Sequence, residues 1–109
     1  MTVSEVIAAI KAGQSLENAD LTGLDLSGQD LRKAKLSFAT LKDCNLQGAD
    51  LRDAVLNEAD LSFANLRDAD LRGASLKRTN LTRANRIGAK IRKWALKKAY
   101  IAGPTAYRD

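Results

Sequence analysis

The sequence of 109 residues contains no histidine, one cysteine and few aromatic residues, which make up 5% of the chain. Without histidine it lacks the commonest general base and the commonest metal ligand, and a lone cysteine cannot complete the usual zinc sites. Cys44 has no partner for an intrachain disulfide, which is typical of a reducing compartment. We therefore expect no enzyme, no metal and no cofactor, and a core built from aliphatic side chains.

Long apolar runs are also missing. The longest, Val6 to Ile10, is far too short to span a bilayer. Glu5 precedes it where a signal peptide would carry positive charge. We therefore expect a cytoplasmic protein, and the length indicates a single domain over residues 1–109.

Acidic residues are scarce in one part of the chain only. Residues 1–76 carry 8 Lys/Arg and 12 Asp/Glu, whereas residues 77–109 carry 10 Lys/Arg and one acid. The net charge of +5 therefore hides an acidic segment of −4 followed by a basic segment of +9. Such a division indicates two electrostatically different surfaces.

Leucine, in contrast, is abundant and recurs at every fifth position without a miss. The fourteen positions are Leu16, Leu21, Leu26, Leu31, Leu36, Leu41, Leu46, Leu51, Leu56, Leu61, Leu66, Leu71, Leu76 and Leu81. A helix face needs steps near 3.6 and a strand face needs steps of 2, so neither explains this period. Alanine is preferred two residues before each leucine and Asp or Asn directly before it. The unit reads Ala-(Asp/Asn)-Leu-x-x, as in residues 49–53.

This unit, repeated over about residues 16–85, strongly resembles the pentapeptide-repeat family. The resemblance implies an all-β solenoid, a right-handed quadrilateral β-helix in which each pentapeptide forms one side of a square. The leucine and the alanine two before it would point inward, and the other three positions would face solvent. Four units to a coil give about 3.5 coils for the fourteen leucines.

A helix is expected at each end of this β-helix, because unpaired coil edges invite further pairing. Thr2 and Glu5 form a capping box, and helical spacing of apolar residues follows, which predicts a helix over residues 3–12. The β-helix is then expected over residues 14–85. Leu24, in a position usually held by alanine, is expected to fill space under the N-terminal helix.

The pattern changes after Leu81, where Arg86 falls at the next leucine position. Five apolar residues then follow the spacing of one helix face, namely Ile87, Ile91, Trp94, Ala95 and Ala99. We expect a basic C-terminal helix over residues 86–102 and a tail over residues 103–109. If this helix serves only as a cap, Trp94 is expected to pack on the last coil.

Three groups of residues are candidate interaction sites. Residues twenty apart should stack, which aligns four arginines beside a column of aspartates; the arginines are Arg32, Arg52, Arg72 and Arg92. The column serves either as a surface charge ladder or as a face for an acidic partner. Phe38 and Phe63 occupy outward positions and form a contact patch or two unrelated exposed rings. The basic helix presents either solvated charge or a site for anions, through Lys90, Lys93, Lys97 and Lys98. Cys44, at an alanine position, is expected to be buried and inert.

These features favour a non-enzymatic scaffold that binds a protein partner. The alternative is nucleic-acid or anionic-membrane binding through the basic C-terminal helix. Some members of the pentapeptide-repeat family mimic B-form DNA and protect DNA gyrase through a strongly acidic surface. The net charge of +5 disfavours this role for the present chain. A solenoid end or an exposed apolar strip could also support a homodimer, a question that the sequence leaves open.

Overall fold

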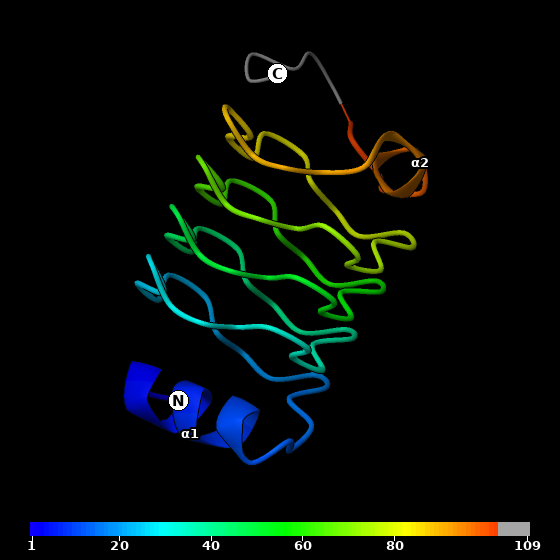
Figure 1. Ribbon diagram of the computed structural model, residues 1–109. Helices are drawn as coiled ribbons and strands as arrows, with labels where there is room; N and C mark the ends of the chain where they lie inside the picture. The colour runs from blue at the N-terminus through cyan, green and yellow to red at the C-terminus, as the bar shows by residue number, and fades with distance from the viewer. Residues whose placement is uncertain (103–109) are drawn as a thin grey trace.

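The computed structural model describes residues 1–102, which form a stack of coils (Figure 1). Parallel bridges join residues twenty apart, from Ser15 with Lys35 to Asn80 with Tyr100. Twenty residues are four pentapeptides, so each coil has four sides. The bridged positions lie directly before the leucines, and the chain therefore forms a β-helix solenoid.

The interior of the solenoid is a column of leucine and alanine side chains. All fourteen repeat leucines are at most 5% exposed, and the inward alanines from Ala34 to Ala84 are at most 2% exposed. Burial of each leucine contributes roughly 1.5–3 kcal/mol. The small alanine leaves room for the leucines of the other sides, which explains why the two residue types alternate inside.

A tight turn closes each side of a coil. The N–H of the inward alanine donates to the carbonyl of the preceding leucine, as from Ala19 to Leu16 at 3.1 Å. The residue two after each leucine has a positive φ, and ten of these residues are not glycine. Positive φ at the third residue is what a type II turn requires. The five-residue period therefore joins a short extended piece to a turn.

The preference for Asp and Asn before leucine comes from a local hydrogen bond. The Asp20 carboxylate accepts from the N–H of Thr22 at 3.1 Å, and the Asn45 amide oxygen accepts from the N–H of Gln47 at 3.1 Å. The same contact recurs at Ser15, Asp25, Asp30, Asp50, Asp60, Asn65, Asp70, Asn80 and Asn85. Short polar side chains stabilise turns in this way.

The first coil is covered by helix α1, Val3–Lys11, which lies across its open end (Figure 1). The Thr2 hydroxyl accepts from the N–H of Glu5 at 3.2 Å, and the Glu5 carboxylate accepts from the N–H of Thr2 at 2.8 Å. Val6 and Ala9 are buried against the coil. The helix ends one residue before the expected boundary, and half-buried Leu24 packs against the same core.

The expected C-terminal helix over residues 86–102 is wrong. The β-helix continues past residue 85 to Lys90, which bridges Asp70, and only α2, Lys93–Leu96, is helical. Ile91, Leu96 and Ile101 continue the leucine positions at five-residue steps, and all three are partly buried against the core. Because a finished coil offers a ladder of hydrogen-bonding partners, this register prevails over the helical pattern.

The side chains of Trp94 and Arg86 also lie differently from what the helical pattern predicts. Trp94 does not pack on the last coil but is 58% exposed, while Arg86 fills a leucine position and is buried. Tyr100 returns to the ladder, where its N–H donates to the Thr79 carbonyl at 2.8 Å. The expected tail, residues 103–109, lies outside the described residues.

Cys44 is buried at an alanine position, as expected, and its thiol donates to the Leu21 carbonyl at 2.9 Å. Burial raises the pKa of this thiol, which disfavours the reactive thiolate. Thr79 occupies an equivalent position and donates to the Leu56 carbonyl at 2.6 Å. The interior thus accepts a small side chain that can hydrogen-bond to the coil below.

Candidate interaction surfaces

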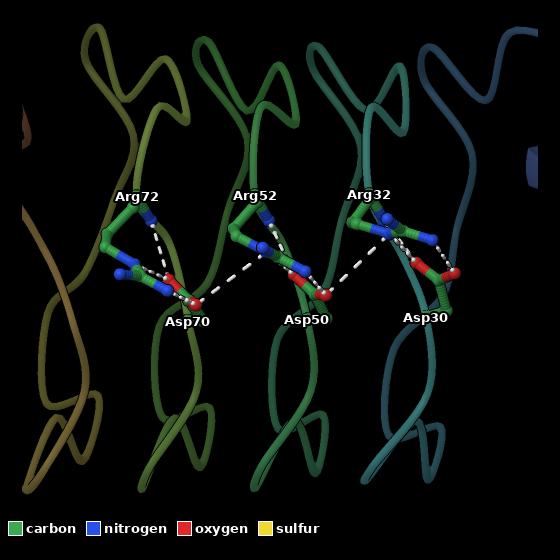
Figure 2. Close-up of polar contacts among 6 residues, drawn as sticks. All are labelled: Asp30, Arg32, Asp50, Arg52, Asp70 and Arg72. Atoms are coloured by element: carbon green, nitrogen blue, oxygen red, sulfur yellow. Dashed lines mark hydrogen bonds and ion pairs between the residues drawn. The ribbon is translucent and has the colours of Figure 1, made fainter.

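One side of the solenoid carries an arginine–aspartate ladder. Its members are Asp30, Arg32, Asp50, Arg52, Asp70 and Arg72 (Figure 2). Within a coil each arginine pairs with the aspartate two residues before it. The distance from the arginine Nη2 to the aspartate Oδ2 is 2.9 Å for Arg32, 2.7 Å for Arg52 and 2.6 Å for Arg72. Between coils, Arg32 Nε lies 3.8 Å from Asp50 Oδ2, and Arg52 Nε lies 3.8 Å from Asp70 Oδ2.

These pairs compensate the like charges that stacking brings together. Hydrogen bonds from Arg72 lower the pKa of Asp70 from its ordinary 3.8 to about 2, and those from Arg32 lower the pKa of Asp30 to about 2. The Asp50 carboxyl also has a lowered pKa, caused first by its hydrogen bond from Arg52. Because the arginine side chains are 43–54% exposed, each pair contributes little to stability alone. The ladder is an almost neutral, regularly spaced surface.

Acid should weaken this ladder. A carboxyl whose pKa is lowered by folding adds stability above its ordinary value near 3.8, and this contribution disappears as the pH falls towards 2. We expect the triple variant D30N/D50N/D70N to be less stable than the parent at pH 7, with the difference shrinking between pH 4 and pH 2. Asparagine keeps the oxygen that caps the turn, so the comparison isolates the charge.

Urea unfolding followed by circular dichroism at pH 7, 4 and 2 measures this difference. The variant D43N/D53N/D68N removes the same number of charges from turn positions and serves as the control. A gap between the ladder variant and the parent that stays constant over the pH range would show that the ion pairs do not stabilise the fold.

The expected continuation of the ladder to Arg92 lacks its acidic half. Lys90 stands where aspartate stands in the coils below, and no ion pair joins Arg92 to a carboxylate within residues 1–102. Arg92 still lies on the same side, since it lines a hollow of about 280 Å³ with Arg52 and Arg72. The upper end of this side is therefore positively charged.

Phe38 and Phe63 lie at opposite ends of one side of the solenoid. The Phe38 N–H donates to the Asn57 carbonyl of the next coil at 3.0 Å. Between the two rings, the bridge from Thr40 to Asp60 joins the coil of Phe38 to the coil of Phe63. The rings are 52% and 50% exposed, and both residues have a φ of 61°. We call the surface between them, formed by residues 38–43 and 58–63, the phenylalanine face.

The lysines expected on one helix are instead distributed around the last coil. Lys90 belongs to the ladder side, Lys93 begins α2, and Lys97 and Lys98 follow that helix. All four are exposed. The Arg78 N–H donates to the Lys98 carbonyl at 2.8 Å, which joins this segment to the coil below.

Sequence reasoning missed the lower half of this cluster. Lys77 and Arg78 lie twenty residues before Lys97 and Lys98, and the stacking rule used for the arginine column would have paired them. Because a helix was expected over residues 86–102, the twenty-residue stacking rule was not applied to the C-terminal segment. We call the combined surface the basic–aromatic patch; it comprises Lys77, Arg78, Lys93, Trp94, Lys97, Lys98 and Tyr100.

Over residues 1–102 no cluster of three or more His, Cys, Asp or Glu side chains is arranged to hold a metal ion. Neither of the helices described is long and apolar enough to cross a bilayer.

A family model for pentapeptide repeats matches residues 15–48, 34–73 and 59–93 of the sequence. The chain belongs to the pentapeptide repeat family. The matched region extends well past Leu81, in agreement with the continuation of the solenoid to Lys90. No curated protein matches the sequence.

Solved structures of other pentapeptide repeat proteins are similar to this chain. One from the thylakoid lumen of Arabidopsis thaliana is 38% identical, with a TM-score of 0.68. One from the cyanobacterium Cyanothece 51142 is 30% identical, with a TM-score of 0.70. A third, from Nostoc PCC 7120, is 42% identical with a TM-score of 0.57, and the match covers 93% of this chain and 86% of that one.

The match to the first two structures covers 88% and 86% of this chain but only 59% and 64% of theirs. The chain therefore spans about three fifths of the length of those relatives. The likeness establishes the architecture of the repeats, while the surface side chains must be judged on their own chemistry.

Proposed function

We propose that this pentapeptide repeat protein is a non-enzymatic scaffold that binds a protein partner through the phenylalanine face. One observation carries the proposal. Two large apolar side chains occupy turn positions where glycine, asparagine or aspartate would fit with less strain, and neither ring belongs to the core.

The backbone conformation at Phe38 and Phe63 is costly for a bulky residue. The left-handed region disfavours L-residues with a Cβ by roughly 1–2 kcal/mol. The other turns with this conformation in residues 1–102 carry glycine, as at Gly23, or a polar residue, as at Lys33 and Arg78, so an apolar ring is unusual there. A strained residue that adds nothing to the interior supports a role outside it.

The chemistry of the phenylalanine face suits a protein surface with apolar side chains and charges of both signs, because the face contains Lys42 together with Asp43, Glu58 and Asp60. The Lys42 ammonium lies 5.8 Å from the centre of the Phe63 ring, which gives this end of the face a positive charge beside an aromatic ring. Aromatic anchors surrounded by small polar residues are typical of the centres of protein interfaces. Thr40 and Asp60, both partly exposed, supply that polar surround.

Photo-crosslinking tests the proposal in the native host. We expect p-benzoyl-phenylalanine at position 38 or 63 to capture the same protein, because both positions border one face. Replacement of Lys33 or Asp53, which have the same turn conformation on another corner, provides the control. Capture of the same proteins from all four positions, or of none from positions 38 and 63, would refute the proposed face.

The captured protein can then be tested against the variant F38G/F63G. Because glycine relieves the left-handed strain, the free energy of unfolding should stay unchanged or rise by up to about 1 kcal/mol. Affinity for the partner, measured by calorimetry, should fall at least about tenfold if the rings are anchors.

Mimicry of DNA towards gyrase receives no support from the ladder side. Every carboxylate of the ladder is paired with an arginine, so this side does not present a continuous row of negative charge. A supercoiling assay with purified gyrase, with and without the protein, tests this alternative directly.

A further inference from the structure

We infer that the basic–aromatic patch binds single-stranded nucleic acid. This site lies above the phenylalanine face on the stack of coils, since bridges join Tyr100 to Asn80 and Asn80 to Asp60, but the inference does not depend on the function proposed for that face. It is built from α2, the segment that follows α2, and the coil below. The backbone hydrogen bond from the Arg78 N–H to the Lys98 carbonyl joins that segment to the coil below.

Most of the positive charge of the basic–aromatic patch is not compensated by acidic side chains of residues 1–102. In the lower coils Arg52 lies between Asp50 and Asp70, so the protein supplies the counter-ions itself. The basic–aromatic patch contains five basic residues and no acid, namely Lys77, Arg78, Lys93, Lys97 and Lys98. Within residues 1–102 a single ion pair reaches the patch, from Arg78 to Glu58 at 3.3 Å. A polyanion would supply the missing negative charge and release its own counter-ions.

Two aromatic rings are exposed among these charges. Trp94 is 58% exposed and Tyr100 is 57% exposed, and lysines precede Trp94 and lie between the two residues. Flat rings beside ammonium groups are the elements with which single-strand binders stack bases and neutralise phosphates. Because every base has a flat face, we expect little dependence on base sequence.

The geometry disfavours a duplex and a membrane surface. Helix α2 has four residues, which is too short to enter a major groove or to lie in a lipid interface as an amphipathic helix. The apolar residues of α2 also do not face outward together, since Ala95 is buried and Leu96 is partly buried. An unpaired strand, whose bases are free to stack, is the polyanion that fits two separate rings.

Trp94 is the only tryptophan, so its fluorescence reports directly on the patch. We expect titration of the full chain with a fifteen-nucleotide oligo-dT to quench this fluorescence. Affinity, measured by anisotropy of a labelled oligonucleotide, should fall as salt rises, with a logarithmic slope of about −0.7 for each phosphate contact. The same oligonucleotide annealed to its complement, and vesicles containing phosphatidylglycerol, should bind more weakly.

Matched variants separate this site from general attraction to positive charge. We expect K93Q/K97Q/K98Q and W94A/Y100A each to weaken binding at least about tenfold. The control K33Q/K35Q/K42Q removes the same charge from the lower coils, and F38A/F63A removes two exposed rings from the coils below the patch; both should retain binding. All the substituted side chains are exposed or, for Phe38 and Phe63, outside the core, and circular dichroism verifies that the variants fold.

Three results would overturn the inference. These are an unchanged Trp94 signal at saturating oligonucleotide, an equal loss of affinity in the two lysine variants, and tighter binding to the duplex or the vesicles than to the single strand. Each of them can be read from the unmodified protein or from a variant whose folding has been verified.

Discussion

Replacing Leu61 with alanine is expected to lower the free energy of unfolding by about 2–5 kcal/mol. Leu61 is fully buried, and its N–H donates to the Asn80 carbonyl at 2.8 Å. Because bridges join Asp60 to Thr40 and to Asn80, the coils on either side hold the backbone in place. The cavity left by the missing side chain therefore cannot close easily.

Guanidinium unfolding of the parent and the variant measures this loss. Ile87 is 45% exposed, so I87A removes an aliphatic side chain from the surface and is expected to cost less than about 1 kcal/mol. Equal losses in L61A and I87A would mean that the repeat leucines do not form the core.

Enlarging the inward alanine should also destabilise the fold, for the opposite reason. We expect A64L to cost about 1–3 kcal/mol, because Ala64 is 1% exposed and faces leucines that already fill the coil. The parent carries a leucine in the same column at position 24, where the first coil meets α1 instead of another coil.

The matched control is A19L, in the first coil, where Ala19 is only partly buried. Its cost should be smaller than that of A64L, since one neighbour is a helix that can shift. The same unfolding experiment compares the two. A greater loss in A19L than in A64L would contradict the view that the middle coils are filled to a fixed volume.

The leucine period made the solenoid predictable, because no helix or strand has a five-residue repeat. The fate of residues 86–102 could not be read in the same way. Arg86 breaks the leucine series, and Ile87, Ile91 and Trp94 fit one face of a helix. The outcome depends on the ladder bonds that a preceding coil offers to Lys90 and Tyr100, which are tertiary contacts that a local pattern does not contain.

Of the candidate surfaces, too, one could be predicted from the residue spacing and the others depend on tertiary structure. The ladder could be predicted because Arg32, Arg52 and Arg72 are twenty residues apart and aspartate precedes each by two. The strain at Phe38 was invisible in the sequence, since it depends on the sign of φ at the turn. The basic–aromatic patch could not be predicted, because Lys97 and Lys98 were assigned to a helix and were therefore not stacked on Lys77 and Arg78.

Nuclear Overhauser contacts between backbone protons of a labelled sample test most directly whether coils of twenty residues extend to Tyr100. A solenoid that extends this far predicts contacts between residues twenty apart along its whole length, including Asp50 with Asp70, Asp70 with Lys90, and Asn80 with Tyr100. Contacts between residues three and four apart throughout 86–102, with none between Asn80 and Tyr100, would contradict it.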